Sequence, residues 1–431
     1  MLSFRSVFAV VFPLASGVLN AQVDPGVRSG PPGAGTPIAG MSAGETYFFT
    51  NQGIPQFTEV ETVSSGLGPR FNLNSCAGCH AQPAVGGTSP AMNPQVALAP
   101  AIAPGSTVPP FLQPNGPVRE VRFIRNPDGT PDGGVHDIFT IVGRSDAPAG
   151  CAISQPDFSN PNNIIFRIPT PLFGAGLIEA ITDTTLKQNL ASDPDGKKAQ
   201  FGIRGHVNTS ANDGTVTRFG WKAQNKSLMI FAGEAYNVEM GVTNENFPTE
   251  REENPNCATN PTPESGPGFN VGSMDPSDIT SFMGFMKFLD QPTPACTGTA
   301  CSASIQNGRQ MFVQVGCATC HTPGLTTGLN ASAALSQQTA NLFSDIALHH
   351  MGPRLADGIA QGAAGPDEFR TAPLWGLGQR IFFLHDGRTS DLLQAIRDHG
   401  TPGSEAEAVV DAFQSLTKSQ KQDLLNFLRS L

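Results

Sequence analysis

The strings CAGCH at Cys76–His80 and CATCH at Cys317–His321 set the organisation of this sequence. Each reads Cys-x-x-Cys-His, the attachment signature of c-type haem, in which two thiols form thioethers with one porphyrin and the histidine binds its iron. A thiol redox pair and half of a zinc site also use Cys-x-x-Cys, but a histidine after the second cysteine, twice in one chain, favours haem. We therefore expect two covalently bound haem c groups. The residues predicted to hold them are Cys76, Cys79 and His80 for the first, and Cys317, Cys320 and His321 for the second.

The first residues have the pattern of a secretory signal peptide. Arg5 precedes an apolar run, Val7–Leu19, and the small residue Ala21 offers a cleavage position before Gln22. The run is too short to span a bilayer, although a retained membrane anchor is the alternative. Residues 1–21 are therefore expected to be removed, and a periplasmic protein without a membrane span is expected to remain. Export agrees with covalent haem attachment, which in bacteria takes place outside the cytoplasm.

Charge and composition exclude some partners and predict many loops. The formal net charge is −10, and the sequence lacks the excess of basic residues that is typical of nucleic-acid-binding proteins. The chain has 47 Gly and 37 Pro in 431 residues, together about a fifth of the chain. These two residue types usually make up ~12% of a protein. Long ordered loops are expected, with the porphyrins supplying part of the apolar core.

Four cysteines remain outside the two motifs: Cys151, Cys257, Cys296 and Cys301. An even remainder in an oxidising compartment suggests two disulfides, with three possible pairings. Cys296 and Cys301 lie close together in one Pro/Thr/Gly-rich stretch, so their pairing is the simplest expectation and leaves Cys151 for Cys257. Free buried thiols are the alternative.

Similar features surround the two motifs in the same order. An amphipathic lead-in precedes each (42–53 and 307–316), and related strings, TPLFGAG at 170–176 and APLWGLG at 372–378, follow. Helical patterns at 276–290, with Ser277 as N-cap, and from Thr417 to the C-terminus close each half. This order predicts a mainly α fold of two cytochrome c-like domains, residues 22–290 and 303–431. Segments 118–126, 136–144 and 162–170 predict a few short strands inserted in the first domain.

Several strings resemble those of the di-haem oxidoreductase family, a group of thiol oxidoreductases and peroxidases related to bacterial di-haem cytochrome c peroxidases and to MauG. The strings are GPRFNLNSCAGCHAQPAVGG (68–87), FTIVGRSDAPAGC (139–151), FRIPTPLFGAGLIEA (166–180), ALHHMGPRLADG (347–358), EFRTAPLWGLGQR (368–380) and FLHDGRTSDLLQAI (383–396). One departure is visible: the family usually has an acidic residue where His350 stands. The resemblance implies a peroxide-reactive N-terminal haem and an electron-transferring C-terminal haem.

The second haem has a candidate for its sixth ligand. His399 lies fourteen residues after His385, and the corresponding position holds a methionine in the related peroxidases and a tyrosine in MauG. His399 is therefore the first choice as the distal ligand of the His321 haem. His349, His350 and Met351, in a Gly/Pro-flanked loop, are alternatives.

The first haem has no such candidate. Only Met92 follows its motif closely, and His136 and His206 are isolated histidines, so an open distal face is expected. Peroxide chemistry also needs a general base, which in the related peroxidases is a glutamate. Glu179, in the apolar stretch 172–181, is the candidate for that catalytic role, since burial would raise its pKa; a capping or ion-paired glutamate is the alternative.

Three further expectations concern the surroundings of the haems. Trp375 and Trp221 are candidates for carrying electrons between them, although ordinary core packing is the first expectation for either residue. Arg388, in the HDGR string, is expected to pair with a propionate. The related enzymes bind calcium, and the strings at 126–134 and 193–196 offer oxygen ligands, although both would also serve as plain turns.

Together these observations predict an exported enzyme, a di-haem oxidoreductase that reduces hydrogen peroxide or another small oxidant. A small cytochrome c or a cupredoxin would supply its electrons. Two other functions fit the same motifs: a pure electron carrier in which both haems have six ligands, and an oxygenase or protein-modifying enzyme on the same scaffold.

Overall fold

The computed structural model describes residues 22–102, 108–132, 141–142, 144–249, 254–258, 260–265 and 276–431. The predicted signal peptide, residues 1–21, and His136 lie outside the described residues. Helices make up most of the regular structure, and every strand is short, which confirms the prediction of a mainly α fold. The α-helices are α1 Ala43–Phe48, α2 Ile54–Thr58, α3 Cys76–Cys79, α4 Pro94–Ile102, α5 Ala175–Ala180, α6 Asp183–Ala191, α7 Lys197–Phe201, α8 Leu228–Met240, α9 Asp278–Phe288, α10 Ala303–Gln314, α11 Leu392–Asp398, α12 Glu407–Ser415 and α13 Lys418–Ser430.

The strands pair two by two and form no large sheet in the described part of the chain. They are β1 Arg70–Phe71, β2 Glu120–Phe123, β3 Ile141–Val142, β4 Ile164–Arg167, β5 Asn208–Thr209, β6 Val216–Thr217, β7 Leu325–Thr326, β8 Thr339–Ala340, β9 Leu348–His350 and β10 Glu368–Arg370. The predicted strands at 118–126 and 162–170 are β2 and β4, which pair antiparallel with Glu120 opposite Arg167. The second half also contains short strands, which the sequence analysis did not predict: β7 pairs with β8 and β9 with β10.

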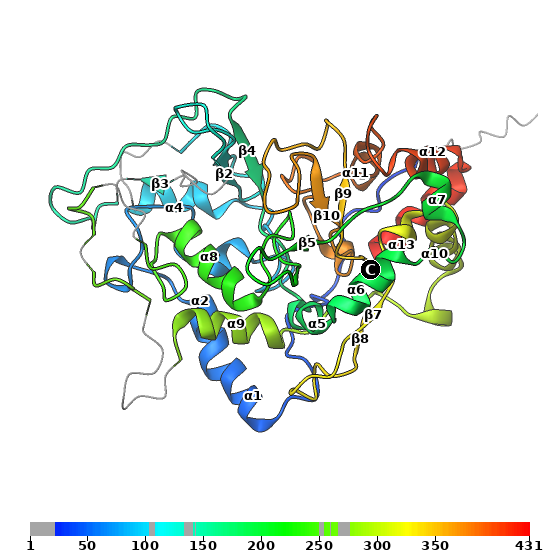
Figure 1. The fold of residues 1–431 in the computed structure, drawn as a ribbon, viewed down its shortest axis with the longest axis horizontal. Helices are drawn as coiled ribbons and strands as arrows, with labels where there is room; N and C mark the ends of the chain where they lie inside the picture. The colour runs from blue at the N-terminus through cyan, green and yellow to red at the C-terminus, as the bar shows by residue number, and fades with distance from the viewer. Residues whose placement is uncertain are drawn as a thin grey trace, which may run out of the picture.

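Helices α1, α2, α8 and α9 gather at one side of the molecule (Figure 1). Ser42 begins α1 with a capping box, in which its hydroxyl accepts a hydrogen bond from the Glu45 N–H and the Glu45 carboxylate accepts one from the Ser42 N–H. The predicted closing helix of this half is α9, and Ser277 caps it as expected. Phe57 of α2 stacks on Phe285 of α9 with ring centroids 4.2 Å apart. These contacts join the lead-in before the first motif to the closing helix.

Helices α10 and α13 pack closely at the opposite side (Figure 1). Gly308 in α10 makes this approach possible, because a Cβ there would lie 1.9 Å from the Asp423 carbonyl oxygen of α13. Thr417 caps α13 in a second capping box, as predicted for the C-terminal helix. Phe312, Phe427 and Leu425 belong to a core cluster formed entirely by residues of the second half. The order of lead-in helix, motif and closing helix therefore recurs in both halves.

Several contacts cross the predicted boundary at residues 291–302, so that boundary stays a prediction. The chain near its start lies against the second half, where Asp24 forms an ion pair with Arg429 at 2.6 Å. A buried ion pair of 2.9 Å joins Arg167 of β4 to Asp357. His206 and Leu348 form an isolated β-bridge between the halves.

The disulfide pairing agrees with the prediction. Cys151 is bonded to Cys257, and Cys296 to Cys301. The four cysteines of the two Cys-x-x-Cys-His motifs are free of disulfides, so their thiols are available for another bond. Among the residues that the structure describes, no helix has the length and apolar character needed to cross a membrane.

Candidate functional site

The first motif lies in the wall of a cavity between α3, α8 and α9. Cys76, Cys79 and His80 all line it. The rest of the wall is largely apolar and includes Phe57, Leu172, Phe231, Tyr236, Phe282 and Met286. The residues bound about 1140 Å³ of empty space, part of which is open to solvent. The first motif therefore faces a largely apolar cavity.

The second motif lines a second cavity of the same kind. Cys317, Cys320 and His321 face about 1400 Å³ of empty space, again partly open to solvent. Its wall is built by the second half, with Phe312 of α10, Leu392 of α11, Val409 of α12 and Leu424 of α13. The structure therefore brings each set of attachment residues together at one apolar cavity.

The motif histidines are held in the orientation that an iron ligand requires. The Nδ1 atom of His80 donates a hydrogen bond to the Gly87 carbonyl at 2.9 Å, and that of His321 donates to the Phe343 carbonyl at 3.0 Å. Burial lowers the pKa of both imidazoles to about 4, so both rings are neutral. A neutral ring that carries its proton on Nδ1 has a lone pair on Nε2, and a backbone carbonyl on Nδ1 is the usual partner of a metal-bound histidine.

His399 has the same arrangement and lines the second cavity. Its Nδ1 donates to the Ala395 carbonyl at 2.7 Å, and burial lowers its pKa. His349 lines the cavity too, but carboxylates accept from both of its ring nitrogens: Asp345 at 3.0 Å and Glu405 at 2.8 Å. That ring has no lone pair to offer a metal. His350 does not line the cavity, whereas Met351 does. Of the four candidates for the sixth ligand, His399 therefore has the geometry of a ligand, and Met351 is the remaining alternative.

Two buried arginines, not singled out from the sequence, suit the second cavity to an anionic cofactor. Arg370 and Arg380 line it, and both donate hydrogen bonds to backbone carbonyls: Arg370 Nε donates to Gly220 at 2.9 Å and Arg380 donates to Pro373 at 3.3 Å. Burial lowers the pKa of both guanidinium groups to about 10. Buried charges are costly unless paired, and haem propionates are anions of the required charge. The residues present therefore fit a haem.

The first cavity contains a pair of carboxyl groups that the sequence analysis missed. Glu120 of β2 and Glu239 of α8 both line it and are hydrogen-bonded to each other. Burial alone would raise the pKa of Glu120, but the ion pair with Arg122 and the bond from Glu239 outweigh burial and lower it. Burial, then the negative charge of Glu120, raises the pKa of Glu239 well above its usual range. The two pKa shifts run in opposite directions, so a proton shared by the pair is favoured on Glu239 rather than on Glu120.

Trp221 lines both cavities, and among the described residues it is the one that the two walls share. Its indole N–H donates to the Ile168 carbonyl at 2.9 Å, and its ring meets that of His385 edge-on with centroids 6.4 Å apart. An oxidisable ring is therefore fixed between the two sites.

The family model described as "Di-haem oxidoreductase, putative peroxidase" matches residues 127–431. The chain belongs to this di-haem oxidoreductase family. The matched region includes the second motif, while the first motif, at 76–80, precedes it. Members of the family are enzymes that use haem, so this di-haem oxidoreductase is an enzyme of the same class. A search of curated proteins returned no match.

Solved structures show a distant likeness. Hydrazine synthase of Kuenenia stuttgartiensis is 13% identical over 61% of this chain and 88% of its own, with a TM-score of 0.29. A MauG-like protein associated with microbial copper homeostasis is 16% identical over 61% and 90%, with a TM-score of 0.29. The diheme peroxidase BthA of Burkholderia thailandensis is 13% identical over 63% and 88%, with a TM-score of 0.31. At these scores the likeness supports no comparison of individual residues.

Glu179 does not line the first cavity of this di-haem oxidoreductase, so its expected catalytic role stays a prediction. Glu179 ends near the start of α8, where its Oε1 accepts a hydrogen bond from the Leu228 N–H at 2.8 Å. The residue is absent from the wall around His80. It caps a helix, which is the alternative that the sequence left open.

Two residues expected to bind the cofactor also lie elsewhere. Trp375 lines neither motif cavity and instead packs against Gly174, at which a Cβ would meet its ring at 2.5 Å. Arg388 pairs with its neighbour Asp386 at 2.7 Å and donates to the Arg354 carbonyl. Its guanidinium is thus occupied within the HDGR turn. Arg370 and Arg380 line the second cavity, whereas Arg388 does not.

The two strings considered for calcium form turns in their described parts. Asp128 accepts hydrogen bonds from the N–H and hydroxyl of Thr130, and Asp193 accepts from the N–H groups of Lys198 and Ala199. Gly133 and Gly134 lie outside the described residues. Within the described chain, neither string contributes to a group of three His, Cys, Asp or Glu donors close enough to hold one ion.

Proposed function

We propose that this chain is an exported, peroxidase-like di-haem enzyme with a reactive site at His80 and an electron-transfer site at His321. The observation that carries the proposal is the difference between the two cavities. The wall around His80 contains a proton-sharing carboxyl pair and, in the described chain, no second histidine. The wall around His321 contains His399, whose Nε2 is free to bind a metal.

Covalent attachment is part of the proposal. Cys76 and Cys79 would hold one haem and Cys317 and Cys320 the other, with His80 and His321 as iron ligands and His399 as the second ligand at His321. When bound, the haem iron supplies the redox chemistry with peroxide. The protein holds the groups in a largely apolar wall and pairs their propionates with buried arginines.

Glu239 and Glu120 are proposed to move the protons. Reduction of hydrogen peroxide to two water molecules takes up two electrons and two protons. The raised pKa of Glu239 favours the protonated form, which can donate a proton, whereas the lowered pKa of Glu120 beside Arg122 favours the carboxylate, which can accept one. Two carboxyl groups whose environments push their pKa values apart are the pattern of an acid and a base working together.

Trp221 is the proposed route between the two sites. It lines both cavities, and its ring can be oxidised more readily than the phenylalanines around it. Electrons would arrive at the His321 side from a small cytochrome c or a cupredoxin. Trp221→Phe should slow electron transfer between the haems while haem content stays unchanged, and Trp375→Phe is the matched control, which should have no effect.

Purified full-length protein tests the proposal directly. A pyridine haemochrome assay should give two covalently bound haems per chain, falling to one in Cys76→Ser/Cys79→Ser and in Cys317→Ser/Cys320→Ser. The holoprotein should consume peroxide when supplied with a reduced donor protein. Absence of high-spin iron together with absence of peroxide turnover would contradict the proposal and favour a pure electron carrier. Oxygen uptake with an organic substrate and without peroxide would favour an oxygenase.

A further inference from the structure

Tyr236 of α8 lines the first cavity, and its hydroxyl is bonded to a buried carboxylate that does not. The hydroxyl donates to Oε1 of Glu61 at 2.8 Å, and the two residues are only 2% and 3% exposed. We propose that Tyr236 is a redox-active residue of the first site, giving one electron to the reduction of hydrogen peroxide and, with it, one proton to Glu61. The inference rests on the proposed peroxidase function and adds a residue to it.

Aromatic rings that can be oxidised readily are rare in this chain, which has two Tyr and two Trp among 431 residues. Tyr236 and Trp221 line the first cavity. Tyr47 is 63% exposed in α1, and Trp375 lines neither motif cavity. The phenylalanines of the wall are much harder to oxidise than a phenol or an indole. Tyr236 and Trp221 are therefore the two rings from which the first site can draw an electron.

The hydrogen bonds of these two rings decide what each can lose. A phenol becomes a strong acid when it loses an electron, so a buried tyrosine is oxidised readily only where a base contacts its hydroxyl. Burial raises the pKa of Glu61, so its carboxylate binds a proton more tightly than an exposed one does. Proton transfer needs a contact of ~2.6–3.2 Å, and the Tyr236–Glu61 distance of 2.8 Å meets this condition. The indole N–H of Trp221 instead donates to the Ile168 carbonyl, a weak base, so Trp221 can lose an electron but keeps its proton.

The fold holds both partners in place beside the first motif. The Tyr236 ring meets that of Phe282 of α9 edge-on, with centroids 5.0 Å apart. Glu239 lies three residues further along α8, on the same helix face, and lines the same cavity. The Glu61 N–H donates to the carbonyl of Asn74, in the loop that leads into the first motif, at 2.8 Å. The redox-active ring and the proposed acid are therefore presented to one cavity by one helix.

The proposed step removes one hydrogen atom from tyrosine and returns it later. The O–H bond of Tyr236 breaks, its proton joins Oε1 of Glu61, and its electron goes to the first site, where hydrogen peroxide is the two-electron oxidant. The other electron comes from the haem sites. When a further electron arrives along the Trp221 route, the phenoxyl radical takes up that electron and recovers its proton from Glu61. Tyr236 thus stores one oxidising equivalent while a one-electron donor supplies the site.

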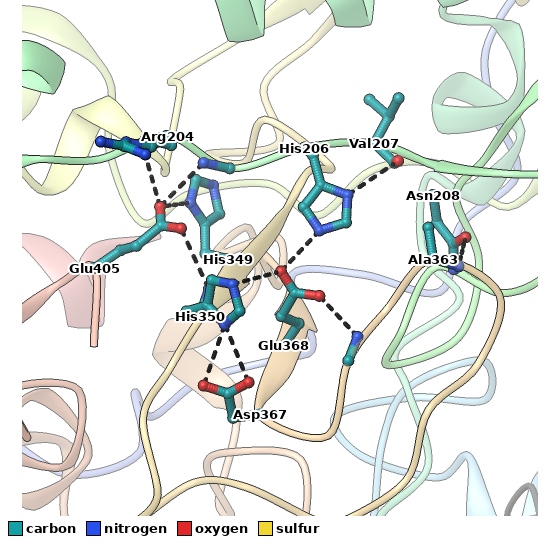
Figure 2. A network of polar contacts seen from close by, with 12 residues as sticks. Arg204, His206, Val207, Asn208, His349, His350, Ala363, Asp367, Glu368 and Glu405 are labelled. Atoms are coloured by element: carbon teal, nitrogen blue, oxygen red, sulfur yellow. Dashed lines mark hydrogen bonds and ion pairs between the residues drawn. The ribbon is translucent and has the colours of Figure 1, made fainter. Parts of the chain in front are cut away.

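The polar network between the two halves differs in this respect (Figure 2). Glu405 accepts hydrogen bonds there from Nδ1 of His349 at 2.8 Å and from the N–H groups of Arg204 and Gly205 at 3.0 and 3.1 Å. Imidazole and backbone N–H groups are not readily oxidised, so these bonds can hold a proton but cannot store an oxidising equivalent. The Tyr236–Glu61 pair combines an oxidisable ring with a base at the first cavity.

Freeze-quench electron paramagnetic resonance of the holoprotein tests the proposal. Oxidised holoprotein mixed with hydrogen peroxide, without a donor protein, should show an organic radical with the hyperfine pattern of tyrosine. Tyr236→Phe should abolish this signal. Glu61→Gln should slow its formation by ~10²- to 10⁴-fold, because the amide oxygen can accept the hydrogen bond but cannot hold the proton. Wild-type protein made with ring-deuterated tyrosine should give a narrower signal, a readout that needs no variant.

Tyr47→Phe is the matched control, since it removes the exposed tyrosine of α1 and should leave the signal at full strength. Haem absorption recorded on each sample separates two failures. If peroxide changes the haem spectrum but no tyrosyl signal appears, or if the signal survives Tyr236→Phe, the role of Tyr236 is overturned and the peroxidase function stands. If peroxide leaves the haem spectrum of the wild type unchanged, both are overturned. Unchanged haem absorption before peroxide is added verifies that each variant has folded.

Discussion

Replacing Glu239 with Gln removes an acidic proton from the first cavity while keeping the size and hydrogen bonds of the side chain. The amide of Gln can donate to Glu120 as the protonated carboxyl group does, and its oxygen can accept from Asn72, which donates to Glu239 at 2.9 Å. The hydrogen bonds are kept, so the free energy of unfolding should change by no more than about 1 kcal/mol. What disappears is the proton that can be given to a substrate.

The size of the effect follows from this single loss. General acid–base catalysis contributes ~10²- to 10⁴-fold, which corresponds to about 2.7 to 5.4 kcal/mol in the barrier. Glu239→Gln should therefore lower kcat/KM for peroxide by that factor with both haems in place. Glu120→Gln is a less clean variant, because it removes a carboxylate from the buried ion pair with Arg122 and can cost up to about 3–5 kcal/mol of stability.

Stopped-flow consumption of peroxide with a reduced donor measures the effect, and Glu179→Gln is the matched control. Glu179 caps α8 through one oxygen that Gln retains, so this variant should keep near wild-type turnover. Full activity in Glu239→Gln together with loss of activity in Glu179→Gln would refute the reasoning and restore the sequence-based choice.

Three further predictions concern the scaffold. The disulfide Cys151–Cys257 has a sequence separation of 106 and Cys296–Cys301 one of 5, so loop entropy predicts losses of about 4.8 and about 2.1 kcal/mol in the free energy of unfolding when each is replaced by serines. Equal shifts in urea unfolding would contradict this. Gly308→Ala should lower the free energy of unfolding by about 1–3 kcal/mol, because the new Cβ would clash with the backbone of α13. Gly44→Ala is the control: no atom lies near its Cβ position in α1, so the free energy of unfolding should stay the same or rise by up to about 1 kcal/mol. Burial would raise the pKa of Asp24, but the Arg429 ion pair and backbone N–H bonds outweigh burial and lower the pKa. The folded state therefore binds the proton less tightly than the unfolded state. The extra stability of the wild type over Asp24→Asn should be present at neutral pH and fade as the pH falls below about 4. A difference that grows in acid would contradict that assignment.

Local signals predicted the parts of this molecule that depend on neighbouring residues. The two motifs identified the lining of both cavities, and the caps Ser277 and Thr417 marked the starts of α9 and α13. His399 was found because the resemblance supplied its spacing from His385. In each case the informative residues lie within about twenty positions of one another.

The carboxyl pair could not be predicted in this way. Glu120 reaches the first cavity because β2 pairs with β4, and Glu239 because α8 packs beside that cavity. No spacing in the sequence links a strand residue to a helix residue so far along the chain. Glu179 was predicted to be the general base because it stands in an apolar stretch. In the structure its carboxylate instead accepts a hydrogen bond from the N–H at the start of α8.

Trp221 and the two buried arginines illustrate the same limit. In the sequence, Arg370 and Arg380 resemble ordinary charged residues. The fold shows that both are buried and that, in the described chain, they donate hydrogen bonds to backbone carbonyls rather than pairing with acidic side chains. Trp221 and Trp375 looked equivalent in the sequence. The fold distinguishes them, because Trp221 lines both cavities and Trp375 packs against Gly174.

An electron paramagnetic resonance spectrum of the oxidised holoprotein tests the central claim, that the two haem sites differ in their sixth ligand. The unequal cavities predict one high-spin iron, at His80, and one low-spin iron with two histidine ligands, at His321. His399→Gly should convert the low-spin signal to high spin and leave the other signal unchanged. Two low-spin signals in the wild-type protein, or a low-spin signal that survives His399→Gly, would contradict the account.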